Sequence, residues 1–255
     1  MSTGHIKPEL QRKQCSLYDS SFALRLAQRI IDAKLRNQLV VLRRYAKNDN
    51  IDIDENIKYI RLEIKDIFNT QSVSELNGRE GIAAKYYFAG LSKCIDSDFS
   101  FQGRNRRPPK DPFNSMISLG YSIIMNEIYN EIESRGLSPY FGFMHRDSEN
   151  HPTLVSDLLE EWRAVIIDAV VMSLINGHKI SKDMFYYEDG GCFIDKKGLN
   201  IFINKLEKKL MTSAKYLYKA DYEVTFRRAI GLQIDSLIQA IRHEDADIYY
   251  PIVIR

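Results

Sequence analysis

Residues 156–175 read Ser-Asp-Leu-Leu-Glu-Glu-Trp-Arg-Ala-Val-Ile-Ile-Asp-Ala-Val-Val-Met-Ser-Leu-Ile, and this stretch decides the fold. Pro152 suits the first turn of a helix that continues into it. After Ala164 the sequence is apolar on nearly all sides of that helix. Such a helix lies at the centre of a bundle, because only surrounding elements can cover every face. We therefore predict a mainly α fold, a multi-helix bundle with this segment inside.

Apolar residues that recur every three to five positions predict the surrounding helices. The clearest stripe, over residues 20–47, runs through Phe22, Leu26 and Ile30, with Ser20 or Ser21 as its N-cap. A polar loop is expected over residues 97–112, because its prolines cannot continue a helix. The remaining expected segments are helices over about 54–68, 72–93, 113–135, 196–213 and 222–243, and an extended stretch over 249–255.

Glycines mark two local features. Asp189-Gly190 separates two short aromatic runs within residues 184–194, which predicts one small β-hairpin. Gly78 and Gly81 lie inside the expected 72–93 helix, where each costs about 1 kcal/mol relative to Ala. Such a cost often marks close packing or the close approach of a ligand.

Composition describes an ordinary globular chain. Its 255 residues are 44% hydrophobic, enough for one large core or two modest domains. No apolar run reaches the roughly 18 residues that span a bilayer, and the N-terminus lacks the apolar stretch of a secretory signal. A cytoplasmic location with no membrane contact is therefore expected. Cys15, Cys94 and Cys192 are far apart, so we interpret them as ordinary thiols.

Basic residues are concentrated although the net charge is only +2. Residues 25–47 carry seven basic side chains against one acid, Asp32, and residues 104–110 read Arg-Asn-Arg-Arg-Pro-Pro-Lys. Local basic patches can bind phosphates, although each patch alone is more often a solvated surface. The candidate phosphate contacts are Arg36, Arg43, Arg104, Arg106 and Arg107.

Three short segments offer ligands for a divalent metal. Glu80 lies in Asn-Gly-Arg-Glu-Gly, His145 ends Gly-Phe-Met-His, and Asp157 and Glu160 are three apart at the start of the central segment. Residues three apart share one side of a helix, and Glu and His from different helices can build metal sites in bundles. Each residue alone is more often a surface acid, a structural histidine or a first-turn acid, so spacing alone does not decide.

The order of these segments resembles the integrases of CRISPR adaptation, the Cas1 family. The resemblance covers nearly the whole chain from Ser20 to Arg255. It is carried by residues 33–38 (Ala-Lys-Leu-Arg-Asn-Gln), 77–88, 112–121, 139–145 and 157–163, the Gly190-Gly191 hairpin, the Phe-Arg-Arg-Ala-Ile helix at 226–230, and the final Ile-Arg.

The resemblance implies a catalytic metal site. In that family a Glu, a His and a Glu or Asp bind a divalent metal, which matches Glu80, His145 and Glu160 here. Asp157 would be a neighbouring acid that supports the metal or binds DNA. Mn²⁺ or Mg²⁺ would be the cofactor, and the imidazole favours Mn²⁺ slightly. Because His145 must be neutral to bind, we expect binding to weaken as pH falls toward about 6. Arg163 would contact DNA or pair with Glu160 or Asp157.

The resemblance also implies an activity and partners. The chain would be a metal-dependent DNA endonuclease and integrase of antiviral defence, which inserts foreign fragments (spacers) into a CRISPR array by transesterification. Its partners would be double-stranded DNA, both prespacer and repeat, and the small adaptation protein Cas2. Tyr86, Tyr87 and Tyr121 would be core aromatics, or stacking surfaces for splayed bases.

The beginning of the chain departs from the family pattern. These integrases usually start with a β-rich domain that helps form the dimer, whereas about nineteen residues precede the first expected helix here. We interpret residues 1–19 as a remnant of that domain or a linker, and residues 20–255 as the helical metal-binding catalytic domain. A homodimer is expected if the missing domain is supplied. One alternative is a truncated, non-catalytic DNA-binding or assembly module of the adaptation complex. Another is an unrelated helical interaction protein.

Overall fold

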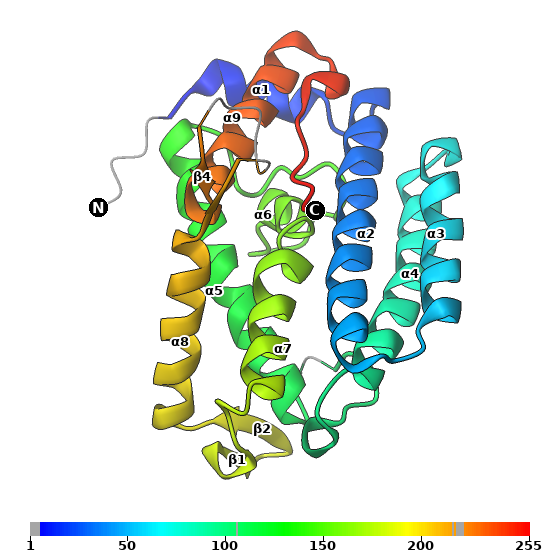
Figure 1. The fold of residues 1–255 in the computed structure, drawn as a ribbon. Helices are drawn as coiled ribbons and strands as arrows, with labels where there is room; N and C mark the ends of the chain where they lie inside the picture. Colours follow the sequence, from blue (N-terminus) through cyan, green and yellow to red (C-terminus); the bar gives the residue numbers. More distant parts are fainter. Residues whose placement is uncertain (1–5, 106, 216, 218–221) are drawn as a thin grey trace.

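Helices make up most of the chain in the computed structural model, which describes residues 6–105, 107–215, 217 and 222–255 (Figure 1). Ser20 caps the long helix α2, Ser21–Asp49, and its hydroxyl accepts the N–H of Ala23. Helices α3, Asp54–Asp66, and α4, Val73–Lys93, lie along one side of α2. Helices α5, Pro112–Arg135, and α8, Lys196–Met211, lie on the other side. The predicted mainly α bundle is confirmed.

The central segment is not one continuous helix, and that prediction was wrong. Helix α6, Thr153–Leu159, gives way to a turn at 160–162, a π-helical segment, Arg163–Asp168, and then α7, Ala169–Asn176. The Ala169 N–H bonds to the Ala164 carbonyl, five residues back, so the turn is wider than an α-helical one. The sequence cannot reveal this change of turn, because its apolar pattern is nearly continuous there. All of α6 is buried, as the prediction of a central element requires.

The predicted hairpin is confirmed. Strand β1, Phe185–Glu188, pairs antiparallel with β2, Gly191–Ile194, and Asp189 and Gly190 both adopt positive φ in the turn. A second, minimal pair was not predicted: β3, Ser213–Ala214, and β4, Val224–Thr225. Because β4 occupies Val224–Thr225, the last helix, α9, spans Phe226–His243 and does not begin at 222 as predicted.

A short helix, α1, covers Pro8–Ser16, ahead of the first expected helix. Its Gln14 is 1% exposed and exchanges hydrogen bonds with the loop that follows α5. The Gln14 amide donates to the carbonyls of Ser138 and Phe141, and the Ser138 N–H donates back to Gln14 Oε1. This helix therefore fastens the segment that leads to His145. The interpretation of residues 1–19 as a domain remnant stays a prediction.

Residues 249–255 form neither helix nor strand and pass between α2 and the central segment. Side chains, rather than a neighbouring strand, make hydrogen bonds to the backbone of this segment. Asn37 donates to the Ile252 carbonyl and accepts the Ile254 N–H, and the Glu161 carboxyl accepts the Ile252 N–H at 2.6 Å and the Tyr249 hydroxyl at 2.5 Å. Burial raises the pKa of Glu161 to about 8, even though these donors favour its charged form.

Two expectations from composition concern membranes and thiols. Within the described ranges, no helix is both long and apolar enough to cross a bilayer. Cys15 is exposed, Cys94 and Cys192 are buried, and none of the three forms a disulfide within the part of the chain that the structure describes.

Candidate metal centre and DNA cleft

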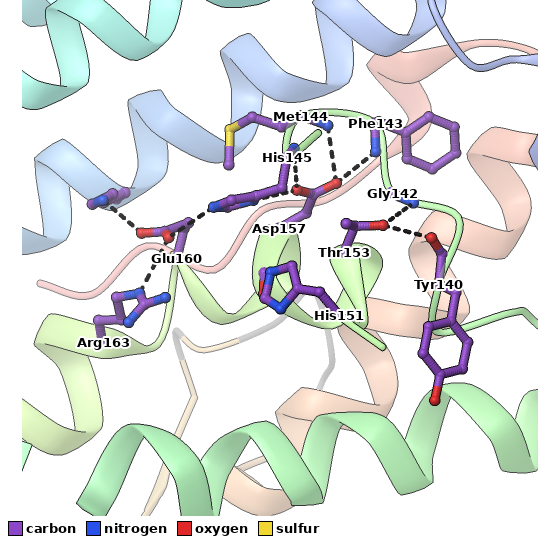
Figure 2. Close-up of polar contacts among 12 residues, drawn as sticks. Tyr140, Gly142, Phe143, Met144, His145, His151, Thr153, Asp157, Glu160 and Arg163 are labelled. Carbon is purple, nitrogen blue, oxygen red and sulfur yellow. Dashed lines mark hydrogen bonds and ion pairs between the residues drawn. The ribbon is translucent and has the colours of Figure 1, made fainter. Parts of the chain in front are cut away.

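His145 is oriented by Asp157 (Figure 2). The imidazole Nδ1 lies 2.7 Å from Asp157 Oδ1, and Nε2 lies 3.8 Å from Glu160 Oε1. Because Asp157 is a carboxylate acceptor, it holds the proton on Nδ1 and leaves the lone pair of Nε2 directed at Glu160. Burial lowers the pKa of His145, but the hydrogen bond and charge of Asp157, with the charge of Glu160, outweigh it. The net pKa lies above the usual 6.5, so this imidazole takes up a proton at a higher pH than an ordinary histidine.

Asp157 also organises the backbone that carries His145. Its fully buried carboxylate accepts the N–H groups of Phe143 at 2.6 Å, Met144 at 3.1 Å and His145 at 3.0 Å. Three consecutive N–H groups on one carboxylate form a tight anion nest. The sequence predicted Asp157 as a supporting acid, and the structure places it behind the histidine rather than beside Glu160.

Gly142 permits this close approach. A Cβ on Gly142 would lie 2.8 Å from the Thr153 backbone carbon and 2.9 Å from Asp157 Oδ2, so a larger residue would push the loop away from α6. The Gly142 N–H donates to the Thr153 hydroxyl, which itself donates to the Tyr140 carbonyl. The Gly-Phe-Met-His motif thus needs its glycine for the contact with the start of α6 (Figure 2).

Glu160 is buried among cations. Its Oε2 accepts a hydrogen bond of 2.5 Å from Lys34 Nζ, and its Oε1 lies 3.2 Å from Arg163 Nε. The Arg163 contact is an ion pair without a well-directed hydrogen bond, because Nε finds no hydrogen-bond acceptor among the described residues. Burial raises the pKa of Glu160, but the charges of Arg163 and Lys34 outweigh it and lower the pKa to about 2. Glu160 is therefore ionised at any ordinary pH.

Lys34 connects the two predicted acidic ligands. Its ammonium, on a side chain only 8% exposed, donates to Glu80 Oε1 and to Glu160 Oε2, each at 2.5 Å. Burial lowers the pKa of Lys34, but the charges of Glu160 and Glu80 outweigh it and raise the pKa above 10.5. Lys34 is not among the site residues predicted from the sequence. The sequence does contain a signal for this role. Lys34 continues the stripe of Phe22, Leu26 and Ile30 at the same spacing of four residues, and a charge on that apolar face needs buried partners.

A cleft of about 830 Å³ opens over these residues. Residues of α2 and α4 line it, together with His145, Glu160 and Arg163. A second hollow of about 710 Å³ shares Asn77, Met144 and His145 with it, so the two adjoin at the histidine.

The predicted DNA-contact arginines divide into two groups. Arg104 and Arg163 line the cleft, and both guanidinium groups lie over the Tyr121 ring, at 5.3 and 4.5 Å from its centroid. Arg36 is exposed, bonds to Asp32 at 2.7 Å and does not line the cleft. Arg43 and Arg107 are exposed away from it, and Arg106 lies outside the described residues. Lys34 and Lys85 line the cleft instead.

The aromatic candidates are mostly core residues. The hydroxyls of Tyr87 and Tyr121 donate to the two oxygens of Asp168, at 2.8 and 2.7 Å, and all three residues are buried. Burial raises the pKa of Asp168 to about 6, against the opposing effect of both hydroxyls. Tyr86 is half-buried and stacks on Tyr59 with ring centroids 4.1 Å apart.

The donor set fits Mn²⁺ or Mg²⁺ in its chemical type. Two carboxylates and an imidazole fixed through its Nδ1 are suitable ligands for such ions. In the part of the chain that the structure describes, no three Asp, Glu, His or Cys side chains converge closely enough to hold an ion. The Lys34 ammonium instead bonds to a carboxylate oxygen of both Glu80 and Glu160.

Comparisons with known proteins agree on a family. A family model described as "CRISPR associated protein Cas1" matches residues 1–208. The chain is 36% identical over 236 residues to the CRISPR-associated endonuclease Cas1 of Mycobacterium tuberculosis, covering 92% of this chain and 69% of that protein. It is 35% identical over 192 residues to a CRISPR-associated endonuclease Cas1 of Thermus thermophilus, covering 75% of this chain and 56% of that protein. The chain thus spans only part of these relatives.

Solved structures share the fold. A casposase bound to its integration product superimposes with a TM-score of 0.82 at 24% identity, covering 92% of this chain and 66% of that one. A CAS1 protein from Thermotoga maritima gives a TM-score of 0.78 at 22% identity, covering 93% of this chain and 71% of that one. At these identities the likeness establishes the fold alone.

Proposed function

Because this chain belongs to the Cas1 family of CRISPR-associated proteins, we propose that it is a metal-dependent DNA integrase and endonuclease that inserts spacers into a CRISPR array. The observation that carries the proposal is the orientation of His145. Asp157 holds its Nδ1 at 2.7 Å, and its Nε2 faces Glu160 across 3.8 Å, in a cleft that Glu80 also lines. An imidazole that one buried acid orients through Nδ1, and whose Nε2 faces a second acid, has the arrangement typical of a metal ligand.

The reaction would be a transesterification. The 3′-hydroxyl oxygen of the incoming fragment would form a new bond to a phosphorus of the repeat. The bond between that phosphorus and the 3′-oxygen of the preceding nucleotide would break. The hydroxyl proton would pass through solvent to the departing 3′-oxygen. A divalent ion held by Glu80, His145 and Glu160 would polarise the phosphoryl group and stabilise charge on the attacking or leaving oxygen. In hydrolysis, water takes the place of the 3′-hydroxyl.

The residues of the chain itself would position the DNA and the ligands. Asp157 keeps the imidazole tautomer that binds through Nε2. Arg104 and Arg163, braced on the Tyr121 ring, present guanidinium groups along the cleft, where they would contact the phosphates on either side of the reacting one. Double-stranded DNA, the Cas2 protein and a second copy of this chain are the partners that we propose for the complete reaction.

Strand transfer on a branched DNA intermediate with Mn²⁺ tests the proposal. We expect His145→Ala to abolish it, because the Nε2 ligand is lost. His151→Ala is the matched control: its ring centroid lies 6.4 Å from that of His145, but its Nε2 bonds to the Ser156 hydroxyl rather than to the acids. This control should retain activity within about threefold. Equal activity in wild type and His145→Ala would refute the proposed role of the site.

DNA binding by variants of the three proposed ligands distinguishes a catalytic role from a role in assembly alone. If neither wild type nor the control transfers strands, but DNA binding is salt-sensitive and persists in Glu80→Ala, His145→Ala and Glu160→Ala, the chain acts as a DNA-binding module of the adaptation complex.

A further inference from the structure

Lys34 and a divalent metal require the same carboxylates. The ammonium bonds to Glu80 and to Glu160 at 2.5 Å each, and its side chain is 8% exposed. The other oxygen of Glu160 already faces Nε2 of His145 at 3.8 Å and Nε of Arg163 at 3.2 Å. A cation of charge +2 bound at either oxygen would lie within a few ångströms of the ammonium, where like charges repel strongly.

The cleft offers Lys34 a second position. Gln38 follows Lys34 by four residues on α2, so the two side chains share one face of the helix, and both line the cleft. Gln38 is 3% exposed, and its Oε1 is buried without a hydrogen-bond partner among the described residues. A buried acceptor that makes no hydrogen bond is costly, so Gln38 Oε1 is a ready acceptor for a neighbouring ammonium.

We propose that Lys34 is an internal counter-ion with two positions: it neutralises Glu80 and Glu160, and it moves to Gln38 Oε1 when a divalent metal binds those carboxylates. This inference rests on the proposed metal site. Its consequence is a threshold in ion concentration for metal binding, because the metal must displace a bonded ammonium and not only water. The cleft therefore keeps its acids paired until the ion concentration is sufficient.

Mn²⁺ affinity of the full chain, measured by titration calorimetry without DNA, tests the first position. We expect Lys34→Met to bind Mn²⁺ at least about tenfold more tightly, because the competing charge is gone. Lys85→Met is the matched control. Lys85 lines the same cleft and is exposed, and among the described residues it forms no ion pair with Glu80 or Glu160, so its removal should change the affinity less than about threefold. Unchanged or weaker binding by Lys34→Met would overturn the inference, because Lys34 would then support the carboxylates.

Gln38→Leu tests the second position. We expect it to weaken Mn²⁺ binding about threefold or more in the wild-type chain, and to have no effect in the Lys34→Met background. An equal effect in both backgrounds would show that Gln38 acts independently of Lys34 and would overturn the two-position scheme.

A measurement on the wild-type chain covers the case in which Lys34→Met does not fold. Lysine ammonium groups give signals in ¹⁵N NMR, and the Lys34 signal is identified by its loss in Lys34→Arg. We expect the Lys34 signal to shift as Mg²⁺ is added. A Lys34 signal that stays fixed while Mg²⁺ binds would overturn the inference. Failure of the metal site itself has a different signature, in which neither wild type nor Lys34→Met binds Mn²⁺, or His145→Ala binds it as well as wild type.

Discussion

At the scale of single residues, Asp157 acts as a small scaffold. One buried carboxylate accepts three backbone N–H groups and the His145 ring. We expect Asp157→Asn to lower the free energy of unfolding by about 3 kcal/mol, because an amide NH₂ replaces a charged acceptor. Mn²⁺ affinity should also fall about 10- to 100-fold, because the ring loses its orientation.

Urea unfolding and metal titration measure both effects. Asp147→Asn is the control, since Asp147 is exposed on the loop that follows His145, and it should change stability by less than about 0.5 kcal/mol. Coincident unfolding curves for Asp157→Asn and wild type would mean that other contacts hold the loop.

Short motifs in the sequence offer Glu80, His145 and Glu160 as candidate ligands, and the resemblance to the Cas1 family, rather than their spacing, selects them. The sequence could not supply the Lys34 bridge. Those contacts join residues 46 and 126 positions apart in the chain, so they depend on how α2, α4 and the central turn pack together. Arg36 and Arg43 were chosen for charge density, and they lie away from the cleft because helical position, not charge, decides which side faces it.

At the scale of elements, two of the three glycines of α4, Gly78 and Gly81, differ in their position relative to the cleft. A Cβ on Gly78 or Gly81 would have no atom within 4 Å, so neither glycine is explained by packing within the chain. Gly81 lines the cleft and Gly78 does not. We expect Gly78→Ala and Gly81→Ala each to stabilise the fold by about 1 kcal/mol, because alanine favours helix, whereas only Gly81→Ala should weaken DNA binding.

Thermal unfolding and a DNA-binding titration distinguish the two glycine variants, and each serves as the control for the other. If Gly81→Ala binds DNA as tightly as Gly78→Ala, the wall of the cleft formed by α4 does not contact DNA.

Most elements could be predicted because caps and stripes are local signals. Ser20, Ser72 and Asp111 each accept a backbone N–H at the start of a helix, as their side chains suggest. Helix α1 was not predicted, because it is short and polar and depends on Gln14 reaching the loop near Ser138. The π-helical turn could not be predicted either, because a shift of one hydrogen bond leaves an almost wholly apolar pattern unchanged.

At the scale of the whole molecule, Asp168 joins the central segment to α4 through Tyr87 and to α5 through Tyr121. Its folded pKa of about 6 exceeds its ordinary value of 3.8. Between these values the folded chain holds a proton that the unfolded chain has lost, so stability falls as pH rises through about 6. We expect Asp168→Asn to remove this slope, which amounts to a total stability change of at most about 3 kcal/mol over the pH range.

Urea unfolding from about pH 4 to pH 8 measures this slope as the difference between wild type and variant. Asp147→Asn again serves as the control, because it should follow the wild-type curve throughout. An Asp168→Asn curve parallel to that of wild type would contradict the assignment.

The 249–255 segment has a consequence for the order in which the protein matures on the ribosome. Ile252 is translated 91 residues after Glu161, and it supplies one of the hydrogen bonds on that buried carboxyl, next to Glu160. A nascent chain that has passed Glu80, His145 and Glu160 therefore still lacks the contacts that complete the turn between α6 and α7. The proposed metal site therefore gains these contacts only after residue 252 has been synthesised, so a chain that stalls between residues 160 and 252 would lack them.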